Sequence, residues 1–278
     1  MNNEIKELIV KPPIKDKYDN GNKFELNKNL PNFHSSQLIL LVASPGNGKS
    51  TIILNLLGAW LTKNGQSYFG EGHFIGPAFR YDPTLAPLLD FFGNQHDDCS
   101  DRVINNIVKH RLENADDAEQ DNCFIVIDDL MALPNFSSRA SSSLSRLSSI
   151  YRHVLSSAKP NDENPNLKKS GGMLLVSNQR LFSSIPRNLR STASCILLGR
   201  VNNKEEYGKI CDEYNLMFGG KKQFTQMMQE CHNEKYGFMC IYINGCMRDD
   251  VDGPCIFKNF NELLYPSIRY PKKTYSID

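Results

Sequence analysis

The sequence predicts an α/β fold with a mostly parallel central sheet, helices on both faces and an antiparallel C-terminal edge. Three observations predict it. A loop of small residues lies between an apolar stretch at 38–42 and a helix-like stretch at 52–61. A continuous apolar run at 123–127 ends in two aspartates. Strand-like and helix-like segments then alternate along the middle of the chain, an order typical of parallel strands with covering helices.

The loop has the pattern A-x-x-x-x-G-K-S of a phosphate-binding loop. It comprises Ala43, Ser44, Pro45, Gly46, Asn47, Gly48, Lys49, Ser50 and Thr51. Its backbone N–H groups and the N-terminus of the following helix favour a bound anion. In such loops the lysine reaches the β- and γ-phosphates and the next hydroxyl binds Mg²⁺, here Lys49 and Ser50. The pattern predicts a P-loop NTPase; the alternative is a glycine-rich turn with a surface lysine.

Composition indicates a globular protein without a strong overall charge. Of the 278 residues, 40% are hydrophobic, which suffices for a sizeable core. Lys and Arg total 32 against 31 Asp and Glu, so any contact with a polyanion must be local. We find no apolar run long enough to span a bilayer and no secretory signal at the start. We therefore expect no membrane partner and a cytosol-like compartment.

We expect three segments. Residues 1–36 are polar and interrupted by prolines, and we expect an N-terminal arm that packs on the domain edge or on a neighbouring subunit. Residues 37–260 carry the apolar and periodic segments of the P-loop domain. Residues 261–278 form a tail with basic and aromatic side chains.

The first helix, which follows the loop, ends near Thr62, because Gly65 supplies a typical stop signal. A second strand region begins at 74–76, and helices are predicted over 85–92 and 102–112. These elements precede the apolar run at 123–127.

The two aspartates after that run are the expected acidic partners of the loop. A continuous apolar run is typical of a buried parallel strand, whose carboxyl end delivers side chains to the ligand crevice. Asp128 would bind Mg²⁺ directly or through water, and Asp129 would orient or deprotonate the attacking water. The alternative is a helix N-cap, a position that aspartate favours.

Residues 137–157 are rich in serine but are predicted to be helical. Leu144, Leu147 and Tyr151 recur at helical spacing, so one face is buried. Arg146 and Arg152 lie on opposite flanks of that stripe and can point out of the subunit core. Two solvated arginines are the alternative.

Polar residues also end the next buried strand, at 172–177. Gln179 follows at the same edge and could sense the γ-phosphate or place the attacking water, although it could also be a loop-capping amide. A turn and helix at 185–190, a strand at 193–198 and a helix from Asn203 continue the α/β order. Two final strands, at 236–243 and 254–257, are predicted to be antiparallel at the sheet edge.

The eight cysteines form no C-x-x-C pair. We expect free, mostly buried thiols. A metal held by Cys231, Cys240, Cys246 and Cys255 with His232 is the alternative, although the spacings are long for zinc.

The chain resembles a known family. The resemblance rests on the phosphate loop and on Ile127-Asp128-Asp129, Ser177-Asn178-Gln179, residues 185–190 and residues 203–206. These are similar to the genome-packaging ATPases of large cytoplasmic DNA viruses and virophages, members of the FtsK/HerA group of DNA-pumping motors. The similarity covers about residues 36–260. It implies ATP and Mg²⁺ as ligands and a homo-oligomeric ring, hexameric or pentameric. It also implies sequence-independent binding of double-stranded DNA and capsid proteins as partners. The location implied is the host cytoplasm at virus assembly sites, or the virion.

The resemblance also implies a role for each motif residue. Lys49 and Ser50 would contact triphosphate and Mg²⁺, Asp128 would bind Mg²⁺, Asp129 would be the catalytic acid and Gln179 the sensor. One arginine, Arg152 in preference to Arg146, would reach a neighbour's γ-phosphate. There are two departures from the family pattern. Ala43 replaces the usual glycine, and aspartate at 129 is shorter than glutamate.

A motor of this kind grips DNA phosphates with lysines or arginines on pore loops. Candidates are Lys168 with Lys169 and Lys221 with Lys222, although ordinary solvated lysines are the alternative.

Other functions remain open. A cellular or plasmid translocase or helicase of the same group is the nearest, and a small-molecule P-loop kinase or a nucleotide-binding assembly scaffold are the others. A regulatory GTPase would need N-K-x-D late in the chain, whereas Asn203-Lys204-Glu205-Glu206 ends in the wrong residue.

Overall fold

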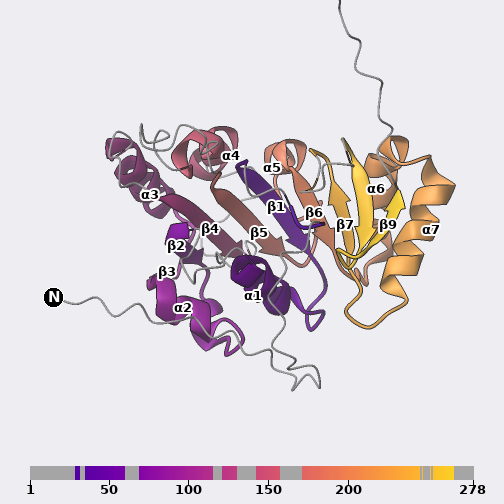
Figure 1. Ribbon diagram of the computed structural model, residues 1–278, viewed down its shortest axis with the longest axis horizontal. Helices are drawn as coiled ribbons and strands as arrows, with labels where there is room; N and C mark the ends of the chain where they lie inside the picture. The colour runs from indigo at the N-terminus through magenta and orange to yellow at the C-terminus, as the bar shows by residue number, and fades with distance from the viewer. Residues whose placement is uncertain are drawn as a thin grey trace, which may run out of the picture.

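The computed structural model describes residues 29–31, 35–59, 69–114, 121–129, 142–156, 171–244, 246, 251, 253–265. Through them runs a nine-stranded sheet in the order β3-β2-β4-β5-β1-β6-β7-β8-β9, with helices packed on both faces (Figure 1). The strands are β1 (Gln37–Val42), β2 (Phe69–Ile75), β3 (Asn94–His96), β4 (Asn122–Asp128), β5 (Met173–Asn178), β6 (Cys195–Leu198), β7 (Met239–Tyr242), β8 (Cys255–Lys258) and β9 (Glu262–Tyr265). The helices are α1 (Lys49–Ala59), α2 (Ala86–Phe92), α3 (Asp101–Glu113), α4 (Ser142–Val154), α5 (Arg187–Thr192), α6 (Lys204–Tyr214) and α7 (Lys221–His232), with 3-10 turns η1 (Phe79–Tyr81) and η3 (Asn215–Met217).

The parallel part of the sheet comprises the six strands from β3 to β6. β1 lies between β5 and β6, and the register places Val42 beside both Asn178 and Leu198. β4 pairs with β5 so that Asp128 lies opposite Ser177. The carboxyl ends of these strands therefore meet at one edge, where the sequence places its candidate site residues.

The C-terminal part of the sheet is antiparallel. β7 pairs antiparallel with β6, β8 with β7 and β9 with β8. The predicted fold class is thus confirmed: a mostly parallel sheet with an antiparallel C-terminal edge.

A hydrophobic core lies on each face of the sheet, because successive strand residues point to opposite sides. In β1, Leu38, Leu40 and Val42 belong to one core, and Ile39 and Leu41 to the other. Residues of α3 to α7 complete the first core, and residues of α1 and α2 complete the second.

Three elements were missed by the sequence analysis: β3, α7 and β9. Lys221 and Lys222, a candidate pair for a DNA-gripping pore loop, begin α7 and so do not lie on a loop. The helix forms because Phe224, Met227, Met228 and Cys231 recur at helical spacing and are buried. Strand β9 lies within the segment 261–278 that we expected to be a tail.

The described part of the N-terminal segment packs against the antiparallel end of the sheet. The Tyr242 hydroxyl donates a hydrogen bond of 2.5 Å to the Asn29 carbonyl. Leu30 is buried, and Pro31 forms an isolated bridge with Cys246. The rest of the predicted arm, at 1–28 and 32–34, and residues 266–278 lie outside the described residues.

Candidate nucleotide-binding site

The phosphate loop connects β1 to α1, as predicted. Gly46 and Gly48 have φ angles of 73° and 83°, a left-handed conformation that side chains disfavour. The Ile52 N–H donates to the Gly48 carbonyl at 3.0 Å, so the helical hydrogen bonds begin within the loop. The N-terminus of α1 therefore follows the loop directly, an arrangement that favours a bound phosphate.

The loop is fixed to the strands on either side. The Ala43 N–H donates to the Asn178 carbonyl at 3.2 Å, and the Ser44 N–H to the Arg200 carbonyl at 3.0 Å. The Ser44 hydroxyl accepts from the Asn202 N–H at 3.2 Å. These bonds hold the loop between the carboxyl ends of β5 and β6 before any ligand binds.

The alanine that replaces the usual first glycine is accommodated by a glycine elsewhere. Ala43 is fully buried, and a Cβ atom placed on Gly199 would lie only 2.7 Å from the Ala43 Cβ. Because Gly199 has no side chain, the Ala43 methyl group fits beside β6. The alanine thus leaves the loop intact.

Lys49 lies over the loop. Its Nζ donates to the Ala43 carbonyl at 3.1 Å. A lysine ammonium group has three donors, so this bond leaves others that can be offered to phosphate oxygens.

Asp128 is the last residue of β4 and lies opposite Ser177 of β5, the strand that separates β4 from β1 and its phosphate loop. Burial raises the pKa of its carboxyl group, and the positive charge of Lys49 acts in the opposite direction. Its Oδ1 and the Asn178 Nδ2 are buried without a hydrogen-bond partner among the described residues. Unpaired buried polar atoms are rare, and a water or an ion is a common partner for them. A carboxylate oxygen here, with the Ser50 hydroxyl on the loop, fits a hard divalent cation.

Asp129 and Gln179 lie in contact beyond the ends of β4 and β5. Gln179 Nε2 donates to Asp129 Oδ2 at 3.2 Å. Asp129 has a φ angle of 47°, and its N–H donates to the Ser177 carbonyl at 3.0 Å. Residues fifty apart in sequence are therefore joined at the edge where the loop lies, as the sequence predicts.

Glu206 supports the segment after Gln179. Its carboxylate is only 4% exposed, and Oε1 accepts from the Leu181 N–H at 2.5 Å and the Phe182 N–H at 2.6 Å. The Asn203 side chain caps α6 by accepting from the Glu206 N–H at 2.9 Å. This role of Glu206 could not be predicted from the sequence, because its partners are backbone groups that no sequence pattern reveals.

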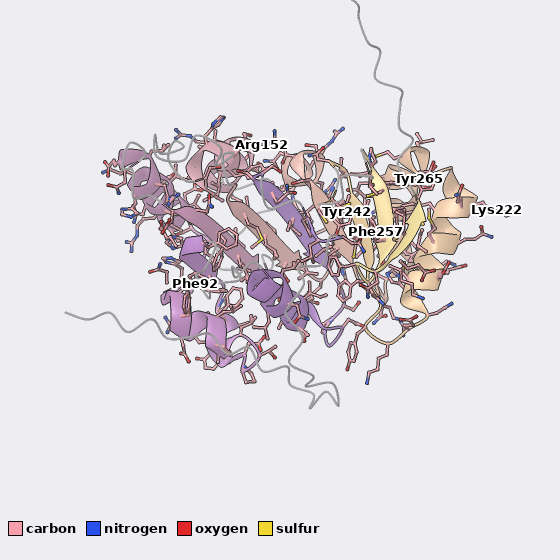
Figure 2. All side chains as sticks on the ribbon, viewed as in Figure 1. Phe92, Arg152, Lys222, Tyr242, Phe257 and Tyr265 are labelled. Atoms are coloured by element: carbon pink, nitrogen blue, oxygen red, sulfur yellow. The ribbon has the colours of Figure 1, made fainter. Side chains whose placement is uncertain are left out.

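The structure places the two candidate arginines away from the loop of their own chain. Arg152 is exposed near the C-terminal end of α4 (Figure 2). It lies at the amino ends of the strands, whereas the phosphate loop lies at their carboxyl ends. The Ser36 hydroxyl donates to the Arg152 carbonyl at 3.4 Å. Because Ser36 directly precedes β1, this bond places the end of α4 at the amino ends of the strands. Arg146 is also exposed, in a groove beside α3. Neither belongs to the site within one chain.

The lysine candidates for DNA contacts are also separated from the site. Lys221 Nζ forms an ion pair with Asp212 at 2.7 Å. Lys222 lies on the outer side of α7 at the margin of the molecule (Figure 2). Lys168 and Lys169 lie outside the described residues.

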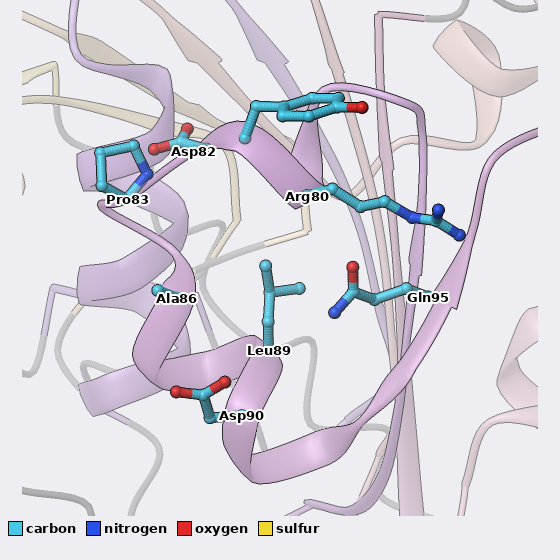
Figure 3. Close-up of a pocket in the computed structure, with 8 residues that line it drawn as sticks. Arg80, Asp82, Pro83, Ala86, Leu89, Asp90 and Gln95 are labelled. Carbon is cyan, nitrogen blue, oxygen red and sulfur yellow. The ribbon is translucent and has the colours of Figure 1, made fainter.

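A surface pocket of about 360 Å³ lies between η1 and α2 (Figure 3). Arg80, Asp82, Leu89 and Gln95 are among the residues that line it. Arg80 forms an ion pair with Asp97 at 3.0 Å, with both side chains more than half exposed. No lining residue belongs to the phosphate loop, β4 or β5, so this pocket is separate from the nucleotide site.

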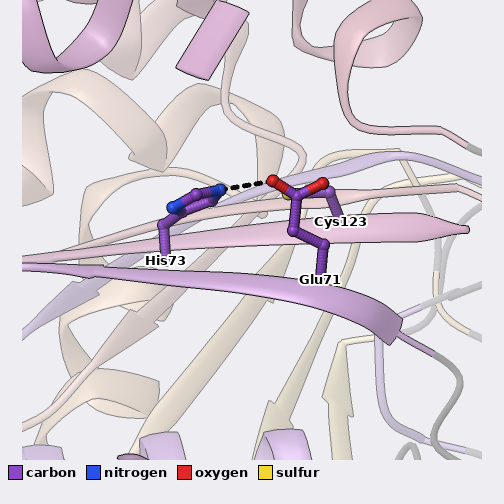
Figure 4. Close-up of side chains that lie close together, drawn as sticks. All are labelled: Glu71, His73 and Cys123. Atoms are coloured by element: carbon purple, nitrogen blue, oxygen red, sulfur yellow. Dashed lines mark hydrogen bonds and ion pairs between the residues drawn. The ribbon is translucent and has the colours of Figure 1, made fainter. Parts of the chain in front are cut away.

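A cluster of Glu71, His73 and Cys123 has ligand atoms within 4.8 Å of one another, as a metal site would (Figure 4). Both Glu71 oxygens are already paired, Oε1 with His73 Nε2 at 2.6 Å and Oε2 with Arg111 at 2.9 Å. The cluster is therefore best explained as a buried ion-pair network.

All eight cysteines are buried and free, as predicted. The late cysteines and His232 do not form a ligand set among the described residues. Within the same residues, no helix has the length and apolar character needed to cross a membrane.

The fold and the loop together define a P-loop NTPase architecture, and solved structures share it. The DNA-packaging ATPase B204 from Sulfolobus Turreted Icosahedral Virus matches with a TM-score of 0.50 and 12% identity, over 76% of this chain and 94% of that chain. The genome-packaging NTPase B204 from Sulfolobus turreted icosahedral virus 2, in complex with sulfate, matches with a TM-score of 0.50 and 13% identity, over 80% and 95%. The pCW3 conjugation coupling protein TcpA has a TM-score of 0.47 and 14% identity, over 77% and 59%. No family model and no curated protein matches the chain.

Proposed function

We propose that this protein is an ATP-driven translocase of double-stranded DNA that packages a viral genome into a preformed capsid. The contact between Gln179 and Asp129 beside the phosphate loop carries the proposal. This hydrogen bond joins the Asp129 carboxylate to the neutral Gln179 amide at the carboxyl ends of the strands, where a γ-phosphate would lie. The similarity in fold to two viral packaging ATPases supports this choice among P-loop functions.

The arrangement of side chains suits hydrolysis. The Asp129 carboxylate would accept the proton of the attacking water or orient it, and Gln179 would report whether the γ-phosphate is present. Lys49, which donates to the Ala43 carbonyl, would offer its remaining donors to phosphate oxygens. Ser50 and Asp128 would hold Mg²⁺, which neutralises charge on the phosphates when bound.

We further propose that the protein acts as a homo-oligomeric ring, hexameric or pentameric. A ring requires a head-to-tail contact in which two different surfaces of each subunit meet. Arg152 lies at the far edge of the sheet from its own loop, which is compatible with a contact to the loop of a neighbour. There it would stabilise transition-state charge, with Arg146 as the second candidate. The motor would work in the host cytoplasm at sites of virus assembly and would dock on capsid proteins.

The proposal is tested by ATP hydrolysis with purified full-length protein over a series of protein concentrations, with and without double-stranded DNA. We expect the rate per subunit to rise steeply with concentration and to increase further with DNA, and Lys49→Ala to abolish it throughout. A flat, DNA-independent rate would overturn the motor and favour a kinase or an assembly scaffold.

The packaging role is tested in infected cells. A virus that carries Lys49→Ala should accumulate empty capsids. Full capsids would instead favour a translocase or helicase with another task.

A further inference from the structure

Tyr236, in the loop between α7 and β7, is an exposed aromatic side chain beside the phosphate loop. Its side chain is 53% exposed. A Cβ atom placed on Gly48, in the middle of the phosphate loop, would lie 3.7 Å from Tyr236 Cδ1. The ring therefore lies in van der Waals range of the loop that would hold the phosphates.

The backbone holds Tyr236 in an unfavourable conformation. Its φ angle is 65°, which bulky residues rarely adopt. Such strain persists where the surroundings impose it, and it is frequent at ligand sites. A nonaromatic residue such as asparagine would fit this conformation better, so local folding does not explain a tyrosine here.

Contacts on both sides fix the Tyr236 segment to the carboxyl edge of the sheet. Before it, the His232 ring is 3.0 Å from the Leu198 carbonyl. Across it, the Gly237 N–H donates to the Glu234 carbonyl at 3.2 Å. After it, the Phe238 N–H donates to Asn259 Oδ1 at 2.7 Å. The ring is thus presented by a fixed turn.

Charge near the ring suits a polyanionic ligand. Lys235 Nζ lies 4.9 Å from the centre of the Tyr236 ring, a cation–π distance. The Lys235 ammonium group thus places a positive charge next to the Tyr236 ring, beside the phosphate loop. In a bound nucleoside triphosphate the base extends away from the phosphates that the loop holds, so it would lie outside the loop, where Tyr236 lies.

We propose that Tyr236 is the platform on which the base of the bound nucleoside triphosphate stacks. This inference rests on the proposed function, since it assumes that the loop binds a triphosphate. Stacking uses the π face that every base has and does not read the hydrogen-bonding edge. Tyr236 would therefore retain ATP and GTP alike, and any preference for adenine would come from other groups.

The test is equilibrium binding, by calorimetry, of ATP, GTP and inorganic tripolyphosphate to the full-length protein. Two variants remove the ring: Tyr236→Ala, and Tyr236→Asn, which tolerates a left-handed backbone. Tyr236→Phe keeps the ring, and Tyr81→Ala removes another exposed tyrosine, 84% exposed, from the η1 turn. Thermal unfolding of each variant checks that the fold is retained.

We expect both ring-removing variants to weaken ATP and GTP binding by about fivefold to 150-fold, the range measured for base stacking. Tripolyphosphate binding should be unchanged, as should all binding to Tyr236→Phe and Tyr81→Ala. Unchanged ATP affinity in Tyr236→Asn would overturn the inference, and so would an equal loss for tripolyphosphate, because Tyr236 would then support the loop itself. If the wild-type protein binds none of the three ligands, the nucleotide site of the proposed function fails as well.

Discussion

At the scale of single residues, the conformation of Asp129 separates the roles of two adjacent carboxylates. Consecutive residues of a strand point to opposite faces. Asp129 leaves β4 with a φ angle of 47°, and its side chain reaches Gln179 while Asp128 is half-buried beside β5. A left-handed aspartate costs roughly 1–3 kcal/mol. The site thus holds one acid suited to a cation and another suited to water.

Asp129→Asn tests the catalytic acid without disturbing the backbone, because asparagine also tolerates positive φ. We expect kcat for ATP hydrolysis to fall by about 10²- to 10⁴-fold, the usual contribution of a general base. ATP binding, measured by calorimetry, should be retained. Asp129→Ala is the comparison: it should lose the same activity and also some stability, since alanine disfavours this conformation. Full activity in Asp129→Asn would exclude the carboxylate as the base.

At the scale of elements, two buried charged side chains connect segments that no local pattern links. Glu206 on α6 holds the turn after β5 through the Leu181 and Phe182 N–H groups. Arg111 on α3 is 2% exposed and donates to Glu71 and to the carbonyl groups of Val154, Asp121 and Ser156. Glu206 supports the segment that follows Gln179, and Arg111 joins α3 to β2 and to the ends of β4 and α4.

Glu206→Ala should destabilise the protein and slow hydrolysis. Two N–H groups lose a charged acceptor, and hydrogen bonds to charged groups contribute about 1.5–3 kcal/mol each, so we expect a loss of about 3–6 kcal/mol in urea unfolding. The kcat value should fall more than ATP affinity, because Gln179 lies two residues before the supported turn. Glu206→Gln keeps an acceptor oxygen and should restore most of both. Equal damage in the two variants would contradict a positioning role.

Glu71 should make stability depend on acid pH. Burial alone would raise its pKa, but His73 and then Arg111 outweigh it and lower the pKa from 4.5 to about 2. A depressed carboxyl pKa stabilises the native state above pH 4.5, and this contribution is lost as pH falls towards 2. The difference in unfolding free energy between wild type and Glu71→Gln should therefore be largest above pH 5 and shrink below pH 4.5.

Denaturant unfolding at a series of pH values measures this difference. Glu113→Gln is the control, because the ion pair of Glu113 with Lys109 is exposed and should contribute little. A difference for Glu71→Gln that grows as the pH falls would contradict the proposed network.

At the scale of the whole molecule, the two ends of the strands carry different parts of the proposed machinery. The phosphate loop, Asp128, Asp129 and Gln179 lie at the carboxyl edge, and Arg152 lies at the amino edge. One subunit therefore cannot bring Arg152 to its own nucleotide. If Arg152 acts in hydrolysis, a second subunit must supply it.

Mixing two inactive variants tests this division. Arg152→Ala should bind ATP normally but lose about 10³- to 10⁵-fold in turnover, the usual effect of an arginine finger. When it is mixed with Asp129→Asn, some interfaces combine an intact acid with an intact arginine, and part of the activity should return. The same mixture with Arg146→Ala in place of Arg152→Ala compares the two candidates. The absence of rescue at every ratio would contradict a role in trans for Arg152.

The sequence by itself determined the fold class, the phosphate loop and the residues at the carboxyl edge, because these depend on local patterns. A strand, a loop and a helix start in direct succession specify Lys49 and Ser50, and a buried parallel strand delivers whatever follows it to the same edge. The helical period of residues 224–231 was equally local, and α7 could have been predicted from it.

Only the tertiary structure decided which side chains meet. The fit of Ala43 against Gly199, the support of the Gln179 segment by Glu206 and the position of Tyr236 beside Gly48 all join segments far apart in the chain. Strand register and the packing of loops set these contacts, and neither leaves a periodic signal. The resemblance implied that Arg152 would act on a neighbouring subunit, but only the folded chain placed it at the amino ends of the strands, away from its own phosphate loop, because α4 returns there to the start of β5.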